Sequence, residues 1–147
     1  MTEKGTTANI HFAGDDLFVG ITPSGHAQAI ETNSARSSAA SPMELLLIAL
    51  GSCTGIDVIS ILKKQRQDVS DYRIEVKGER RAEFPRSYSR LEVKHILRGR
   101  GLSAQAVARA IELSNQKYCS VAATLRGAAE IVTSYEIEEK DQTNEPV

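Results

Sequence analysis

Residues 41–64, SPMELLLIALGSCTGIDVISILKK, constrain the fold more than any other stretch of the sequence. We expect Ser41 to be the N-cap of a long helix, with Pro42 at its first position and Glu44 at its third, which together make a capping box. The cations that end the stretch suit the negative end of a helix dipole. So apolar a helix must be covered on several sides, and the rest of the chain has to be built around it.

Patterns of alternating apolar and polar residues flank this helix. They predict strands at 8–14, 16–22 and 26–32 before it, at 72–78 and 89–97 after it, and at 129–137 near the end. A second amphipathic helix is expected over about 103–118. This order of elements predicts an α+β fold, with helices on one side of an antiparallel sheet. We expect a single domain over residues 1–147, with residues 1–6 and 138–147 disordered.

Composition argues against several classes of function. The 147 residues carry a net charge of -1, which gives no reason to expect nucleic acid or an anionic membrane as a partner. The N-terminus lacks an apolar segment of signal-peptide length, and the longest unbroken apolar run, residues 45–50, is too short to span a bilayer. We therefore expect a cytoplasmic protein whose two cysteines are thiols rather than a structural disulfide.

The centre of the long helix holds Cys53, flanked by Gly51 and Gly55 and followed one turn later by Asp57. The glycines favour close packing against another backbone over contact with a ligand. A cysteine among apolar residues is most often a small buried hydrophobe, and burial disfavours the thiolate. Asp57 leaves three interpretations open: a neutral acid, a partner for an arginine, or a hydrogen-bond anchor to a neighbouring loop. A reactive Cys53 therefore needs positive charge from elsewhere in the fold.

Other candidate side chains carry less information. Cys119 falls at the predicted end of the second helix, where the dipole disfavours a thiolate, although Lys117 could offset this. His95 shares a strand face with apolar residues, which is typical of a core histidine. The spacing of cysteines and histidines supports no zinc site, so no metal is expected.

The segment SPMELLLIALGSCTGIDVISIL, followed much later by KYCSV around Cys119, resembles the OsmC/Ohr family of osmotically inducible and organic-hydroperoxide-resistance proteins. The similarity runs from the first strands to the last, and GSCTGIDV is most similar to the YhfA-like branch. The resemblance implies an OsmC-like fold in which antiparallel sheets pack on a long central helix. It also implies an intertwined homodimer, with the cysteine-bearing helices in its core.

The same resemblance implies thiol peroxidase chemistry. Cys53 would attack an organic hydroperoxide and become a sulfenic acid, and Cys119 would then condense with it to a disulfide. An external dithiol, which in the family can be a lipoylated protein, would reduce that disulfide, so no bound cofactor is expected. The apolar surroundings of Cys53 favour fatty or aryl hydroperoxides over hydrogen peroxide.

Two further residues come from the resemblance. In the well-studied branches an arginine faces the thiolate and is held by a glutamate near the start of the cysteine's helix. Arg36, on the loop before the helix, is the candidate arginine, and Glu44 is its candidate holder. Glu44 is one position away from the family's usual place, which Met43 occupies, and Ser120 stands where many relatives have proline.

Two rival functions use the same residues. One is a non-catalytic dimer that keeps the pocket and binds a small apolar ligand. The other is a redox sensor, in which a disulfide between Cys53 and Cys119 alters partner binding without turnover. Loss of thiols on adding one equivalent of cumene hydroperoxide, followed by turnover with a dithiol, discriminates between the three.

Overall fold

The computed structural model describes residues 5–33 and 35–139. Its contacts divide the chain into two compact units, one ending at Leu46 and the other beginning at Leu47, called here the N-terminal and C-terminal units. The single domain expected from the sequence stays a prediction. The expected disorder at residues 1–4 and 140–147 lies outside the described residues. Residues 138 and 139, which we also expected to be disordered, instead complete the last strand.

The N-terminal unit contains the expected three-stranded meander. Strands β1 (Asn9–Gly14), β2 (Leu17–Ile21) and β3 (Ala27–Glu31) are antiparallel in the order β1-β2-β3. Phe12 pairs with Phe18 in the register, and their ring centroids lie 5.3 Å apart. Both rings are exposed, Phe12 by 67%. This sheet therefore leaves its aromatic pair in contact with solvent.

Helix α1 (Pro42–Lys64) begins where the sequence predicts. Glu44 N–H donates to Ser41 Oγ at 3.2 Å, and Ser41 N–H donates to Glu44 Oε2 at 2.7 Å, which confirms the capping box. The helix is long enough and, with a mean hydropathy of 2.2 over an 18-residue window, apolar enough to meet the criterion for a membrane span. Core helices of soluble proteins meet the same criterion, and Val58 and Leu62 of α1 are completely buried within the protein.

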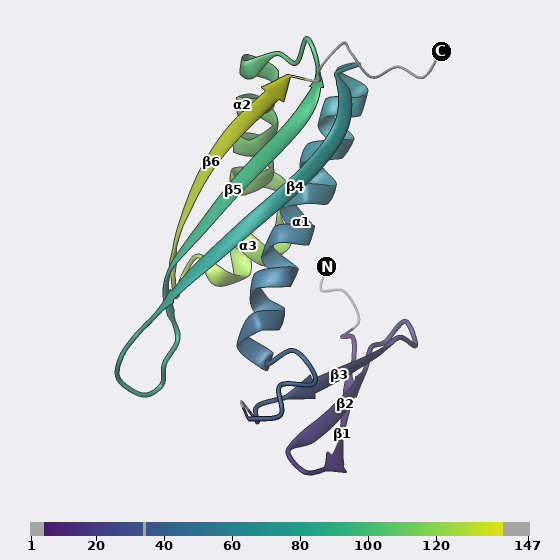
Figure 1. Ribbon diagram of the computed structural model, residues 1–147, viewed down its shortest axis with the longest axis vertical. Helices are drawn as coiled ribbons and strands as arrows, with labels where there is room; N and C mark the ends of the chain where they lie inside the picture. Colours follow the sequence, from purple (N-terminus) through teal and green to yellow (C-terminus); the bar gives the residue numbers. More distant parts are fainter. Residues whose placement is uncertain (1–4, 34, 140–147) are drawn as a thin grey trace. The chain divides into compact units, whose positions relative to one another are not determined.

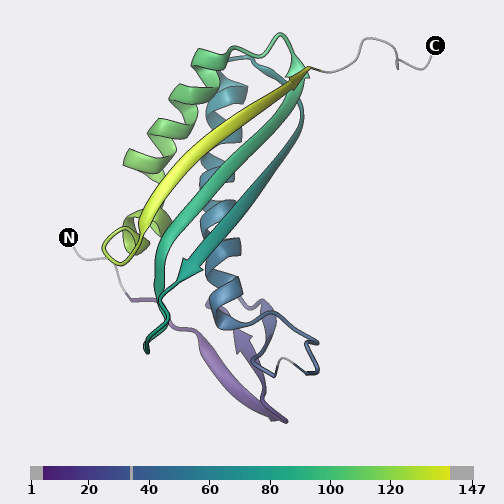
Figure 2. The ribbon, with the colours of Figure 1, turned by 60° about the vertical axis from the view of Figure 1, so that its left-hand side comes forward.

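Three long strands form the sheet of the C-terminal unit, with helices on one face of it (Figures 1 and 2). These are β4 (Asp68–Arg80), β5 (Tyr88–Arg100) and β6 (Glu130–Glu139), in the order β4-β5-β6. β4 and β5 are antiparallel, as expected, but β5 and β6 are parallel. The expectation of purely antiparallel pairing was wrong because the segment between β5 and β6 is a helical crossover, which returns the chain to run in the same direction.

That crossover consists of three helical pieces. α2 (Ala104–Leu113) begins at the N-cap Ser103 and passes directly into a π-helical turn, η1 (Ser114–Tyr118). The sequence predicted the extent of this helix but not its change of pitch. A short helix, α3 (Ser120–Leu125), follows and was missed, since six residues give too little periodicity to recognise.

The core lies between α1, α2 and β5. It is formed by completely or almost completely buried side chains: Val58, Leu62, Leu97, Val107, Ala110 and Ile111. The two glycines of α1 face β4, since a Cβ on Gly51 would lie 2.9 Å from Val76 Cγ2 and one on Gly55 would lie 2.6 Å from Ile74 Cδ1. The close approach expected at the glycines therefore involves side chains of the same chain's own sheet.

Candidate functional site

The two cysteines meet between α1 and the crossover. Cys53 lies in the middle of α1 and is half-buried, whereas Cys119, between η1 and α3, is only 3% exposed. Both are free thiols. They are close enough to interact, because a hydrogen bond with Cys53 and the charge of a Cys53 thiolate both raise the pKa of the Cys119 thiol. The fold thus brings together two residues that are far apart in sequence, with one sulfur more accessible than the other.

Cys119 has a distinctive electrostatic environment. Burial is the largest influence that raises the pKa of its thiol, and Cys53 and the charge of Asp57 act in the same direction, which brings the pKa to about 11. The hydrogen bond that Ala122 N–H donates to Cys119 Sγ at 3.3 Å acts in the opposite direction. Cys119 is therefore a thiol, not a thiolate, near neutral pH.

Cys119 lies at the end of the second helix, as expected, because it is the C-cap of η1. It is also the N-cap of α3, a short helix that the sequence pattern did not reveal. Cys119 therefore lies between the end of one helix, whose dipole disfavours a thiolate, and the start of another, whose dipole favours it.

Asp57 belongs to a polar cluster beside the cysteines. The hydroxyl of Ser114, the first residue of η1, donates to Asp57 Oδ2 at 2.9 Å. On its other side it lies 3.0 Å from Thr54 Oγ1. Ser114 is completely buried and Thr54 nearly so. Of the three interpretations open for Asp57, the structure supports the hydrogen-bond anchor, although its partner is a helix residue rather than a loop.

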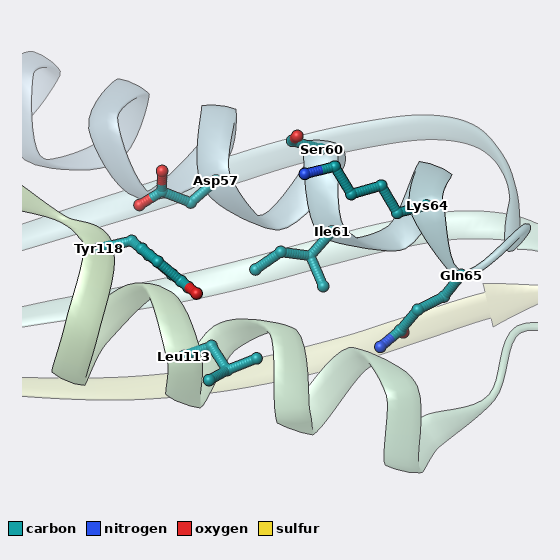
Figure 3. A pocket seen from close by; sticks show the side chains of 7 residues that line it. All are labelled: Asp57, Ser60, Ile61, Lys64, Gln65, Leu113 and Tyr118. Atoms are coloured by element: carbon teal, nitrogen blue, oxygen red, sulfur yellow. The ribbon is translucent and has the colours of Figure 1, made fainter.

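A pocket of about 470 Å³ opens along α1 next to this cluster. Asp57 and Tyr118 lie at one end of it, Lys64 and Gln65 at the other, and Ile61 between them (Figure 3). Its size is within the range of small-molecule sites. Asp57 is therefore reachable from solvent on one side while Ser114 holds it on the other.

The N-terminal unit contains a separate charged site, centred on Arg36. The Arg36 guanidinium donates to Glu31 Oε1 and to the backbone oxygen of Asp15. Glu31, at the end of β3, is buried, and Oε2 accepts a hydrogen bond from Ser38 N–H at 2.8 Å. The hydrogen bond from the Ser38 side chain is the largest influence on the pKa of Glu31, and it lowers that pKa. Burial raises the pKa, but the Ser38 backbone and Arg36 lower it further, so the net shift is downward.

Arg36 is thus an arginine held by a carboxylate, but the carboxylate is Glu31. Glu44, the candidate from the sequence, is engaged with Ser41 in the capping box. The role of Glu31 was not predicted, because the alternating pattern of its strand does not indicate that a loop folds over its carboxylate. Whether Arg36 or Glu44 takes part in catalysis stays a prediction.

His95 is a core residue, as the sequence predicted. It is completely buried in β5, and its Nδ1 lies 2.6 Å from the Tyr72 hydroxyl. Its Nε2 has no hydrogen-bond partner among the residues that the structure describes. Burial lowers the pKa of His95 to about 4 and raises that of Tyr72, so both side chains are neutral near pH 7.

Within residues 5–33 and 35–139, no group of three or more histidine, cysteine, aspartate or glutamate side chains is arranged to hold a metal ion.

Comparisons with known proteins agree on one family. The family model described as OsmC-like protein matches residues 35–134. Protein YhfA of Escherichia coli strain K12 is 48% identical over 120 residues, which cover 82% of this chain and 89% of that protein. A hypothetical protein from Aquifex aeolicus VF5 has a solved structure with a TM-score of 0.84 and 32% identity, covering 95% of this chain and 100% of that one.

A more distant solved structure shares the fold. It is an organic hydroperoxide resistance protein from Elizabethkingia anophelis, with a TM-score of 0.68 over 93% of this chain and 99% of that one. The identity is 15%, so the likeness concerns the fold alone.

Proposed function

The chain belongs to the OsmC-like protein family, and from that premise we propose that it is a thiol-dependent peroxidase that reduces organic hydroperoxides. The observation that carries the proposal is the interaction between a half-buried Cys53 and a buried Cys119. One accessible sulfur beside one protected sulfur is the arrangement that a peroxidatic and a resolving cysteine need. The Elizabethkingia protein, which is named for organic hydroperoxide resistance, has the same fold.

The proposed reaction has three balanced steps. The Cys53 thiolate attacks the terminal peroxide oxygen, so an S–O bond forms, the O–O bond breaks, and the alkoxide leaves and takes a proton. The Cys119 sulfur then attacks the Cys53 sulfenic acid, an S–S bond forms, and the hydroxyl leaves as water. An external dithiol finally reduces the disulfide by exchange and becomes a disulfide itself. A lipoylated protein is a suitable donor, because it carries the required dithiol.

Arg36 is our candidate for the cation that Cys53 needs. A thiolate in an apolar helix is unfavourable unless an opposite charge offsets its desolvation. Arginine stays charged at every relevant pH, and Glu31 already holds the Arg36 guanidinium in one orientation. The pair of Arg36 and Glu31 therefore resembles a prepared cation site more than a free loop charge.

We also propose that the protein works as a homodimer. Ile48, Ser52 and Ile56 form one stripe of α1, and both isoleucines are exposed, Ile56 by 68%. A groove of about 370 Å³ beside this stripe is lined by Ile74 and other residues of α1 and β4. Apolar surface of this kind is typical of a homodimer interface. Sedimentation at micromolar concentration is expected to give twice the chain mass, and a well-folded monomer would contradict the dimer.

The substrate class follows from the surroundings of Cys53. Apolar side chains dominate α1 around it, and each buried methylene of a substrate contributes roughly 0.8 kcal/mol of binding. Fatty or aryl hydroperoxides are therefore favoured over hydrogen peroxide. We place this activity in the cytoplasm, where thiols are kept reduced.

The test is a titration with cumene hydroperoxide. One equivalent is expected to remove two thiols per chain, and dihydrolipoamide is expected to restore them and sustain turnover. Cys53→Ser is expected to abolish peroxide consumption, while Cys119→Ser allows one oxidation and leaves a sulfenic acid that dimedone labels. Equal peroxide reactivity of the two single variants would refute the assignment. Disulfide formation without turnover would favour a redox sensor.

A further inference from the structure

The buried cluster of Thr54, Ser114 and Asp57 connects the two cysteine-bearing segments. Thr54 and Asp57 lie on α1, one residue after Cys53 and one turn after it. Ser114 begins the π-helical turn η1 that ends directly before Cys119. Its hydroxyl, at 2.9 Å from Asp57 Oδ2 and 3.0 Å from Thr54 Oγ1, is the polar link that the structure records between η1 and α1.

Ser114 also holds Cys119 through its backbone. Cys119 N–H donates to Ser114 O at 2.8 Å, which closes the π-helical turn. Cys119 O in turn accepts from Ala123 N–H at 3.1 Å, and its sulfur accepts from Ala122 N–H. The position of Cys119 is thus fixed from both sides, and the η1 side leads through one serine to the helix that carries Cys53. π-helical turns are uncommon and occur frequently at functional sites.

We propose that Ser114 and Asp57 are positioning residues that hold Cys119 beside Cys53 and keep it in reserve as the resolving thiol. This inference rests on the proposed function and extends it to residues that touch neither the peroxide nor the reductant. In the resolving step the S–S bond forms as the S–O bond breaks, and the proton of Cys119 leaves with the hydroxyl as water. The sulfurs must already be in contact for this step to outrun further oxidation of the sulfenic acid.

The charge of Asp57 gives the second half of the inference. It opposes loss of the Cys119 proton, in the same direction as burial and Cys53. The cation nearest in sequence to Cys119 is Lys117 on η1, and its ammonium lies over the Tyr118 ring, 5.3 Å from the ring centroid. A protonated Cys119 is a poor nucleophile toward peroxide, so Cys53 reacts first and Cys119 reacts only with the sulfenic acid. Asp57 thereby adds to the larger effect of burial, which separates the roles of the two thiols.

Ser114→Ala tests the positioning role, with Ser70→Ala as the matched control, at an exposed serine of β4 whose hydroxyl also donates a hydrogen bond. Hydrogen bonds to a charged group commonly change an equilibrium by about tenfold or more. We expect Ser114→Ala to leave sulfenic acid formation unchanged but to slow disulfide closure about tenfold, measured by dimedone trapping in a single turnover. In a glutathione redox buffer, without peroxide, the effective concentration of the Cys53–Cys119 pair is expected to fall by a similar factor.

The two measurements separate the inference from the proposed function. The expected shift in the glutathione titration, with no peroxide consumption by the unmodified protein, would sustain the positioning role and overturn the peroxidase. Normal closure and an unchanged titration in a folded Ser114→Ala protein would overturn the positioning role. Should Ser114→Ala fail to fold, Thr54→Val removes the second hydroxyl at equal volume, and the same readouts apply with a smaller shift.

Asp57→Asn tests the effect of the Asp57 charge separately, because asparagine can still accept the hydrogen bond from the Ser114 hydroxyl. In a Cys53→Ser background, so that Cys119 is the one thiol present, we expect the alkylation profile of Cys119 to move to lower pH. The Ser114→Ala profile is expected to move less than that of Asp57→Asn. Superimposable alkylation curves with and without the Asp57→Asn substitution would overturn the role of the charge.

Discussion

The two units of this protein stabilise themselves in opposite ways. The C-terminal unit has a core of aliphatic side chains between a sheet and two helices, and a cluster of buried polar groups lies beside the cysteines. The N-terminal unit has a three-stranded sheet whose aromatic pair is exposed, and its buried group is a carboxylate, Glu31. The C-terminal unit buries its core within one chain, although α1 also exposes Ile48 and Ile56, whereas the sheet of the N-terminal unit leaves its aromatic pair exposed.

The candidate reactive groups are also distributed between the two units. Both thiols lie in the C-terminal unit, and the carboxylate-held arginine lies in the N-terminal unit. The thiols and the cation that we propose for Cys53 therefore belong to different units of the chain.

Truncation in the core gives the largest expected effect on stability. Leu62 is completely buried among the core residues, so Leu62→Ala is expected to cost about 3 kcal/mol in the free energy of unfolding. Since the contacts lie within one chain, the loss should be the same at every protein concentration. Urea unfolding at two concentrations measures it, and a concentration-dependent loss would show that this core is shared with a partner.

Acid is expected to weaken the two units in sequence. Below pH 6.5 the unfolded chain protonates His95, while the folded chain keeps it neutral down to about pH 4. Stability therefore falls by up to about 1.4 kcal/mol per pH unit across that window. Glu31 has a lowered pKa, so its contribution is present above pH 4.5 and is lost as the pH falls through its folded value.

Unfolding curves between pH 7 and pH 3 check this order, with His95→Phe as the variant that removes the first transition. A slope between pH 6.5 and pH 4 that survives in a folded His95→Phe protein would assign the titration to another group.

Substitution in the exposed aromatic pair should act through association. Phe12→Ser removes an exposed ring from the N-terminal sheet and is expected to weaken dimerisation about tenfold, or about 1.4 kcal/mol, with little effect on unfolding of the separated chain. Sedimentation over a dilution series measures it. An unchanged dimer, together with a lower unfolding temperature independent of concentration, would show that the ring is part of an internal core.

Replacing a glycine by alanine should change the stability of the two units by different amounts. In α1, Gly51 is buried and a Cβ there would lie 2.9 Å from Cγ2 of Val76, a β-branched side chain with little rotamer freedom, so the overpacking in Gly51→Ala is expected to outweigh the gain in helix propensity and to cost about 1 kcal/mol. In β2 a Cβ at Gly20 would lie 3.4 Å from Ile30 Cδ1, so Gly20→Ala should change stability by less than about 0.5 kcal/mol. Thermal unfolding compares the two, and equal effects would contradict the packing described for α1.

Local signals in the sequence predicted much of this molecule. The capping box placed the start of α1, and alternation placed six strands, because both depend on neighbouring residues. The parallel pairing of β5 and β6 was not predictable in the same way, since it depends on the path of the crossover. The short helix α3 was also missed, so the sequence predicted Cys119 at the end of one helix but not at the start of the next.

The candidate site was predictable to a similar degree. The cysteine pair followed from a family resemblance, but its polar supports did not. In the sequence, Ser114 is one small residue on the apolar stripe of a helix, and its contact with Asp57 joins residues that are far apart in sequence. Glu31 belongs to a strand pattern, and the loop that folds over its carboxylate produces no periodic pattern from which the contact could be predicted.

The central claim is that Cys53 reacts as a thiolate because Arg36 supplies positive charge. The direct measurement is the rate of Cys53 alkylation as a function of pH in a Cys119→Ser background, with and without Arg36→Ala. Arg81→Ala, at an exposed arginine of the other unit, is the control. We predict that Arg36→Ala moves the profile to higher pH by about one unit or more, while Arg81→Ala leaves it in place. Superimposable profiles with and without Arg36 would contradict the claim.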